Sequence, residues 1–385
     1  MTRFSKLSLF YFIYFSLLGV MAPYLGLYLE DQGFSLFEIA QLTSLLLFTK
    51  IVAPMLWGAW ADRYQNRMML VRVGALMTAV CYLGFFIAET FWHYAVIIVL
   101  FSSFWNAILP QFEVVTLLSL GGQKDRYSRI RLWGSIGFIV SVVLMGWLFE
   151  ISGVYLFPVT LLIIVTAIFL ASLFKFNEKE PQTKSALVLP GFGKQLKRRD
   201  TLLFFCSCFL LQVSHGAYYT YFSIFLESID YGKTQIGWLW GLGVIAEVIV
   251  FVFMHRWFAK HSIKVVMLVS LAITSIRWCL TAFYSDTFFL LIFAQCLHAF
   301  SFGAMHAAAI KFISLNFGEQ TQGRAQALYS SLSFGLGGAI GAYISGVIVV
   351  KVGYEMIFVV SAFMALFSMM LVFPLRSRLN TGFSS

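Results

Sequence analysis

Residues 7–29 read LSLFYFIYFSLLGVMAPYLGLYL, a run without a single charged side chain. A helix of about 20 apolar residues is long enough to cross the hydrocarbon core of a bilayer. The run is too long for the apolar part of a signal peptide, and no small-residue cleavage pattern follows it. We therefore expect these residues to form a membrane-spanning helix that is retained in the protein.

Similar runs fill most of the chain. Of the 385 residues, 60% are hydrophobic and only 11% are charged, which excludes an ordinary soluble domain. The pattern predicts an all-α integral membrane protein with twelve spans, whose boundaries are soft by a few residues. The predicted spans are 7–29, 37–60, 68–88, 94–119, 132–151, 155–174, 201–226, 235–258, 265–284, 287–313, 325–350 and 354–375. All five cysteines fall within these spans and indicate neither a disulfide framework nor a metal site.

The basic residues lie mainly in alternate loops. With the N-terminus inside, most of the 27 Lys and Arg residues fall on the cytoplasmic face, whereas acidic residues such as Glu30 and Glu227 fall outside. The net charge of +10 is therefore a topology signal and does not indicate a nucleic-acid partner. We expect both termini to be cytoplasmic.

The longest polar stretch divides six predicted spans from six others. It predicts an N-terminal six-helix bundle at 1–174, a cytoplasmic linker at 175–200 and a C-terminal six-helix bundle at 201–385.

The two halves share a spacing. Arg131 follows Glu113 by 18 residues, and Arg324 follows His306 by 18 residues. Small residues, which allow close helix packing, follow both arginines. This favours a chain of two six-helix repeats with a substrate site at their interface.

The end of the second span reads Gly58-Ala-Trp-Ala-Asp62-Arg63-Tyr-Gln-Asn-Arg67. It resembles the signature of the major facilitator superfamily, Gly-x-x-x-Asp-Arg/Lys-x-Gly-Arg/Lys-Arg/Lys, with Gln65 in place of the second glycine and Asn66 in place of one basic residue. We expect the acid to cap or pair with a helix end and the basic residues to bind anionic lipid or latch the halves. The gating-loop candidates are Gly58, Asp62, Arg63, Arg67, Arg131 and Arg324.

Other stretches are similar to the phenylpropionate permease branch of that superfamily. They are Arg131-Leu-Trp-Gly-Ser-Ile-Gly137, Gln212-Val-Ser-His215-Gly-Ala-Tyr218-Tyr219, Gly243-Val-Ile-Ala-Glu247, Arg277-Trp278, Leu297-His298 with His306, and Arg324-Ala-Gln-Ala-Leu-Tyr329. The resemblance implies the major facilitator fold of two pseudo-symmetric bundles. It also implies proton-coupled uptake across a bacterial inner membrane. We expect a multi-pass carrier that works as a monomer and uses no cofactor besides the proton as coupling ion.

Four charged residues lie inside predicted spans: Lys50, Glu113, Glu247 and Arg277. Ions in hydrocarbon are costly and usually mark a substrate or ion pathway. Helix rise places all but Glu113 about 18–20 Å into their spans, near the midplane. We expect a mutually neutralising set around a central cavity, which is typical of a transporter. The sequence shows no metal motif, nucleophile elbow or catalytic loop, so an enzyme is not expected.

Proton coupling is assigned to Glu247, Arg277, His298 and His306. Burial disfavours a charged carboxylate and a nearby cation favours it, so Glu247 is placed to load and release a proton as Arg277 approaches or withdraws. The two histidines are eight residues apart on one helical face, and either can relay the proton or hold Glu247. A static structural ion pair is the alternative reading.

The substrate-binding candidates are two of these charged residues and several polar and aromatic residues of the spans: Lys50, Glu113, Asn106, Gln212, His215, Tyr219 and Trp278. With all four residues ionised, the cavity has no net charge. One added proton gives it a charge of +1, which a bound carboxylate would cancel. The substrate expected from this charge and from the resemblance is an aromatic monocarboxylate such as a phenylpropionate. The alternatives are a proton symporter for a neutral sugar, glycoside or nucleoside, for which Glu113 would accept hydroxyl hydrogen bonds, and an efflux carrier.

Overall fold

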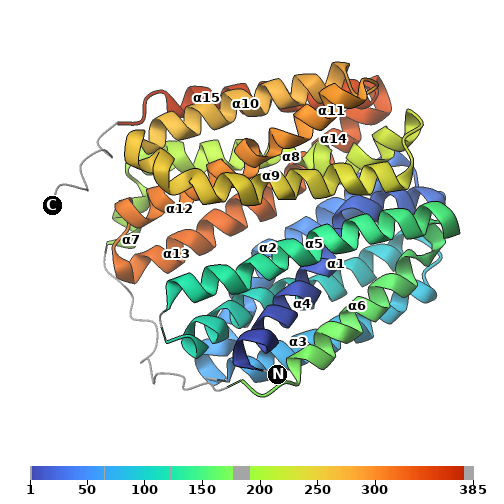
Figure 1. Cartoon of the computed structure of the whole chain (residues 1–385), viewed down its shortest axis with the longest axis horizontal. Helices are drawn as coiled ribbons and strands as arrows, with labels where there is room; N and C mark the ends of the chain where they lie inside the picture. The colour runs from blue at the N-terminus through green and yellow to red at the C-terminus, as the bar shows by residue number, and fades with distance from the viewer. Residues whose placement is uncertain (1, 65, 122, 177–190, 377–385) are drawn as a thin grey trace. The chain divides into compact units, whose positions relative to one another are not determined.

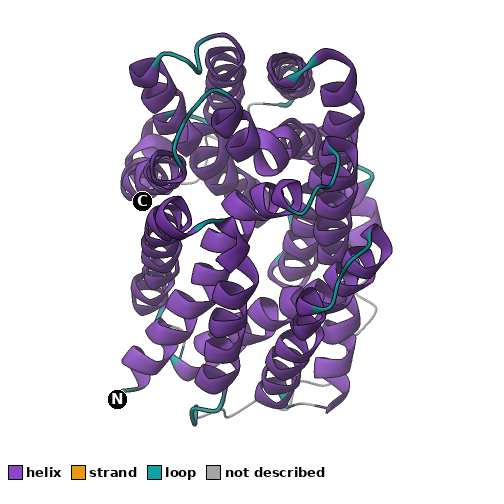
Figure 2. Ribbon diagram, turned by 90° about the vertical axis from the view of Figure 1, so that its right-hand side faces the viewer, coloured by secondary structure: helices purple, strands orange, loops and turns teal. Residues whose placement is uncertain are grey.

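The computed structural model describes residues 2–64, 66–121, 123–176 and 191–376. Within these ranges the chain is helical, contains no strand, and has short loops between helices (Figure 2). Twelve helical segments in this part of the chain are long and apolar enough to cross a membrane. The predicted fold class is therefore confirmed.

Six long helices make up the N-terminal half (Figure 1). They are α1 (Arg3–Asp31), α2 (Leu36–Tyr64), α3 (Arg67–Tyr82), α4 (Phe91–Ser119), α5 (Lys124–Ser152) and α6 (Phe157–Ser172), with short 3₁₀ turns η1 (Leu83–Phe86) and η2 (Val154–Leu156). 

The C-terminal half begins with the short helix α7 (Phe192–Leu196). It continues with α8 (Arg199–Ser228), α9 (Lys233–Lys260), α10 (Ile263–Phe283) and α15 (Tyr354–Val372) as single helices. Two spans contain π-helical segments. One comprises α11 (Phe288–Cys296), η3 (Ala299–Ala304) and α12 (Met305–Asn316), and the other comprises α13 (Glu319–Ser330), η4 (Ser331–Gly337) and α14 (Gly338–Val352).

The chain forms two compact units. The first contains Met1–Ser185 and Leu226–Gly241, and the second contains Ala186–Phe225 and Leu242–Ser385. The predicted division at a central linker places residues 226–241 in the second half instead. Residues 177–190 of the predicted linker lie outside the described residues, so that linker stays a prediction.

Polar side chains cap several helices at their N-termini. Thr2, Asn66, Thr90 and Ser262 each accept a hydrogen bond of 3.0–3.4 Å from a backbone N–H in the first turn of α1, α3, α4 and α10. Such caps satisfy donors that have no partner within the helix. Asn66, which departs from the family signature, therefore has a structural use here.

Glycines end equivalent helices in the two halves. Gly153 follows α5 with φ 93°, and Gly353 follows α14 with φ 88°. Glycine enters this left-handed region without the steric cost of a Cβ atom. Each turn leads directly into the last span of its half.

Close helix contacts also recur in both halves. A Cβ atom at Gly137 of α5 would overlap the backbone of Phe12 in α1, and one at Gly341 of α14 would overlap the backbone of Val213 in α8. Small residues permit this approach between membrane helices. The matching contacts support the internal repeat that the 18-residue spacing indicates.

Candidate functional site

Glu247 and His298 contact each other inside the second unit. Glu247 lies midway along α9, and His298 lies between α11 and η3. Nε2 of His298 is 2.7 Å from Oε1 of Glu247, and the two side chains are only 7% and 12% exposed, respectively. This contact suits a neutral imidazole that donates to a carboxylate, and equally a protonated carboxyl that donates to the ring. A proton can therefore be bound here with little rearrangement.

Ser301 connects this pair to Arg277. Its hydroxyl oxygen accepts a hydrogen bond of 3.1 Å from Nη1 of Arg277 and lies 3.5 Å from Nδ1 of His298. The hydroxyl donates to the backbone carbonyl of His298 at 3.1 Å. Glu247, His298, Ser301 and Arg277 thus form one chain of polar contacts, which we call the polar network. The sequence pattern did not single out Ser301; its position three residues after His298 was the available signal.

Arg277 is completely buried. Its guanidinium carbon lies 4.4 Å from the ring centroid of Tyr218 and 4.2 Å from that of Trp278, so two aromatic faces contact the cation. Nη1 binds Ser301, whereas Nε and Nη2 have no hydrogen-bond partner among the residues that the structure describes. Buried donors of this kind are costly unless a ligand or water satisfies them.

A π-helical turn and two glycines bring α9 close to η3. A Cβ atom at Gly243 would lie 3.2 Å from Cδ2 of His298, and one at Gly303 would lie 3.5 Å from Cγ of Glu247. Single π-turns within α-helices are frequent at functional sites. Here the segment Ala299–Ala304 carries Ser301, and thereby places it between His298 and Arg277.

Residues of α8 and α11 surround Arg277. The hydroxyl of Tyr218 donates to Oε1 of Gln295 at 3.0 Å, and Nε1 of Trp278 donates to Ser214 at 3.2 Å. Nδ1 of His215 bonds the carbonyl of Leu211 at 2.8 Å. The ring of His215 is 5.1 Å from that of Trp278.

Two further side-chain atoms near Arg277 can form additional hydrogen bonds. They are Nε2 of His215 and Nε2 of Gln295, which lack a partner in the described part of the chain. With Nδ1 donating to Leu211, Nε2 of His215 is an acceptor. Arg277 and Gln295 therefore have unused hydrogen-bond donors beside the aromatic rings of Tyr218 and Trp278.

The other predicted residues of this half are placed around the network. Nδ1 of His306 is 3.2 Å from the hydroxyl of Tyr329, while the bond to Glu247 comes from His298. Tyr219 is half-buried, with its ring 6.0 Å from that of His215. Gln212 is buried in α8, where its Cβ lies near Gly337.

Glu113 and Arg131 form a second charged pair, in the first unit. Nε of Arg131 is 3.9 Å from Oε1 of Glu113, and both side chains are about one-third exposed. Tyr127 donates to the same carboxylate oxygen at 3.4 Å. The guanidinium of Arg131 lies 4.1 Å from the ring centroid of Phe15. Arg131, which the sequence reasoning groups with the gating loops, thus contacts the predicted substrate residue Glu113.

Lys50 and Asn106 lie on α2 and α4 of the same unit. Nδ2 of Asn106 donates to the hydroxyl of Thr49 at 2.9 Å, and this hydroxyl also contacts Ser102 at 2.9 Å. Lys50, next to Thr49, is half-buried.

The structure places the gating-loop candidates within helices α2, α3, α5 and α13 and not in loops. Nη1 of Arg67 donates to Oε1 of Gln111 at 2.6 Å and so connects the start of α3 to α4. Gly58 and Arg63 belong to α2, where Arg63 is exposed, and Arg324 is exposed on α13. The side chain of Asp62 lies outside the part of the molecule that the structure describes.

Residues 4–360 match the model of one protein family, whose description is MFS_1 like family. The chain belongs to this family. It is 26% identical, over 95% of its own length and 96% of its relative's, to a "Probable 3-phenylpropionic acid transporter" of Escherichia coli (strain K12). It is also 26% identical to a maltose permease of Geobacillus stearothermophilus, over 86% of this chain and 83% of that protein. 

A crystal structure of the nucleoside transporter NupG superposes on this family member with a TM-score of 0.85. The alignment has 18% sequence identity and covers 98% of this chain and 100% of NupG. The likeness confirms the major facilitator fold. The family model and the E. coli relative confirm the resemblance deduced from the sequence. The protein is a multi-pass transporter of the bacterial inner membrane for a small molecule, and its family and fold are not those of enzymes.

Proposed function

We propose that this protein is a proton-coupled symporter that imports a small aromatic monocarboxylate, such as a phenylpropionate, by alternating access. The coupling ion is the proton and no other cofactor takes part. The carrier works as a monomer, with both termini in the cytoplasm.

The polar network is the observation that carries this proposal. Glu247 supplies an acid that holds a proton in one state and a negative charge in the other, and His298 can hydrogen-bond to both states at 2.7 Å. Intramembrane carboxylates and histidines in chains of this kind are typical of proton pathways. Ser301 extends the chain of contacts to Arg277, so a change of charge at Glu247 alters the environment of the cation.

Charge balance supports an anionic substrate. Glu247 and Arg277 together are neutral when both are ionised, and protonation of Glu247 leaves one positive charge. A substrate carboxylate would cancel that charge and could accept hydrogen bonds from Nε and Nη2 of Arg277. Lys50 is the alternative partner of the anion that the sequence suggests. Proton and carboxylate would then bind together, as symport requires.

Aromatic side chains around Arg277 support a ring on the substrate. Tyr218 and Trp278 lie against the guanidinium, and His215 packs edge-on to Trp278. Offset or edge-to-face contacts of such rings with a phenyl group are favourable. The E. coli relative is named for an aromatic acid of this type.

The second candidate is a neutral sugar, glycoside or nucleoside. The pair of Glu113 and Arg131 favours it, because both side chains are partly exposed and can exchange hydrogen bonds with hydroxyl groups. Relatives named for maltose and nucleosides are consistent with this class. Uptake of a neutral solute with a proton would carry net charge and depolarise the membrane.

Purified protein in liposomes tests both candidates. We expect an imposed inward proton gradient to drive accumulation of 3-phenylpropionate, and dissipation of that gradient by a protonophore to abolish it. Maltose and uridine serve as the neutral comparison substrates. Accumulation of a neutral substrate together with membrane depolarisation would replace the first candidate by the second. Transport that runs outward against the same gradient would overturn import.

A further inference from the structure

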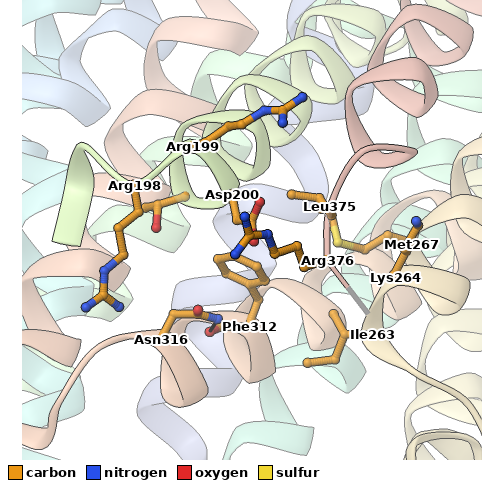
Figure 3. Close-up of a pocket in the computed structure, with 11 residues that line it drawn as sticks. Arg198, Arg199, Asp200, Ile263, Lys264, Met267, Phe312, Asn316, Leu375 and Arg376 are labelled. Carbon is orange, nitrogen blue, oxygen red and sulfur yellow. Dashed lines mark hydrogen bonds between the residues drawn. The ribbon is translucent and has the colours of Figure 1, made fainter. Parts of the chain in front are cut away.

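A hollow of about 430 Å³ lies at one end of the second unit (Figure 3). The starts of α8 and α10 and the ends of α12 and α15 form it. Arg277 is 13 residues further along α10 than Lys264 of the hollow, about 20 Å by helix rise. The hollow is therefore separate from the polar network.

Four cationic residues line this basic hollow: Arg198, Arg199, Lys264 and Arg376. Asp200 is the one acidic residue in its lining, so four positive charges face one negative charge. In Figure 3, Arg376 lies beside Asp200 above the ring of Phe312, and Arg198 and Arg199 extend to opposite sides. The excess of positive charge indicates a ligand with at least one negative charge.

The floor of the hollow is apolar. Ile263, Met267, Phe312 and Leu375 are buried and line it, and all four belong to or directly follow membrane spans. A volume of 430 Å³ lies within the range of roughly 300–1,000 Å³ that small-molecule sites occupy. A ligand that suits both surfaces carries an anionic group on an apolar body.

The position of the hollow at the ends of the spans indicates which of these ligands it binds. Arg199 and Ile263 open two spans and Asn316 closes a third, so the hollow lies at the level where spans end. The sequence predicts this end to be cytoplasmic, and anionic lipid headgroups are found there next to basic pockets between helices. Arginine binds phosphate oxygens through paired N–H donors.

We propose that the basic hollow binds the phosphodiester headgroup of an anionic phospholipid, with the glycerol and upper acyl chain against the apolar floor. Lys264 and Arg376 hold the phosphate, and Asp200 lowers the affinity by its like charge. Free phosphate offers the same anionic group without the apolar body, and so should bind more weakly.

Native mass spectrometry of the full-length protein in detergent tests the site. Phosphatidylglycerol, phosphatidylcholine and inorganic phosphate are titrated separately. We expect Lys264→Gln/Arg376→Gln to weaken phosphatidylglycerol binding roughly 25-fold, about fivefold for each lost cation. The matched control is Arg256→Gln/Lys260→Gln, which removes two exposed cations near the end of α9 outside the lining; it should change binding by less than about twofold.

A third variant is expected to strengthen binding, which misfolding of the protein could not explain. Asp200→Asn removes the like charge, and we expect it to tighten phosphatidylglycerol binding by about fivefold. Equal losses in the two double variants, or no gain in Asp200→Asn, would show diffuse charge attraction and refute the site. Inorganic phosphate that binds as tightly as phosphatidylglycerol would show a soluble phosphate ligand and overturn the lipid assignment.

Discussion

Nε2 of His298 lies 2.7 Å from Oε1 of Glu247, although the two residues belong to different helices and are 51 positions apart. Gly243 faces His298 so closely that an added Cβ would lie 3.2 Å from Cδ2 of the ring, whereas Gly303 leaves ordinary contact distance to Glu247. An acid and a base thus lie at hydrogen-bonding distance with both side chains largely buried. This relationship underlies the predictions on coupling.

Replacement of Glu247 by Gln should separate coupling from binding. Glutamine keeps the shape and hydrogen-bonding capacity of the protonated acid but cannot ionise. We expect proton-driven accumulation of 3-phenylpropionate to fall to background, whereas exchange of external for preloaded internal substrate persists, since exchange requires no deprotonation. Paired uptake and exchange assays in liposomes measure both. The control is Glu89→Gln at an exposed position; wild-type accumulation in Glu247→Gln would assign Glu247 a structural role.

Removal of the Ser301 hydroxyl should slow coupled transport. Ser301→Ala takes one hydrogen bond from Arg277 and the contact from His298. Hydrogen bonds to charged groups contribute about 1.5–3 kcal/mol, so we expect proton-driven uptake to fall by about tenfold or more. Initial uptake rates are compared with those of Ser314→Ala, an exposed serine on α12. Equal rates in the two variants would exclude Ser301 from the network.

A larger residue at Gly341 should destabilise the second unit. Its Cβ would overlap the backbone of Val213, and the two helices cannot separate without loss of their packing. Overpacking of this kind costs about 1–3 kcal/mol. We expect Gly341→Leu to lower the midpoint of thermal unfolding in detergent, while Gly193→Ala, where the added Cβ has open space, leaves it unchanged. An unchanged midpoint in Gly341→Leu would mean that the approach of α8 and α14 is adjustable.

The membrane-spanning helices were predictable because the length of an apolar run can be read directly from the sequence. Every predicted span, such as residues 7–29, overlaps a helix long enough to cross a bilayer. The likeness of the halves was visible in the spacing of Glu113 and Arg131. The equivalent ends at Gly153 and Gly353 became apparent only from their positive φ angles.

The contacts within the site were less predictable, since they depend on how helices rotate and pack. Sequence spacing put His298 and His306 on one face, but the π-helical turn between them and the rings around them give them different partners, Glu247 and Tyr329. Ser301 was not predicted from the sequence, because serine is common in membrane spans and carries no charge. Its role follows from the partners that surround it.

Orientation in the membrane can be measured by cysteine labelling. In a variant without the five native cysteines, a cysteine at Gln320 near the start of α13 should resist an impermeant maleimide in intact cells. A cysteine at Ser228, at the opposite end of its span from the basic loops, should react. Both positions are exposed. Reaction at Gln320 with protection at Ser228 would reverse the orientation that the basic residues predict.

The charge of the substrate can be tested at Arg277, whose Nε and Nη2 have no partner in the described part of the chain. Arg277→Gln keeps a hydrogen-bond donor near Ser301 but removes the positive charge. Removal of one member of a buried, hydrogen-bonded ion pair costs about 2 kcal/mol or more, so we expect affinity for 3-phenylpropionate to fall at least about 30-fold. The neutral 3-phenylpropionamide should change by less than about threefold, because it forms no ion pair. Arg256→Gln, at an exposed position, is the control. If the acid and the amide lose affinity equally, Arg277 shapes the site without binding the anion. Lys50→Gln is then the next variant to compare, since Lys50 is the other cation proposed to hold the carboxylate.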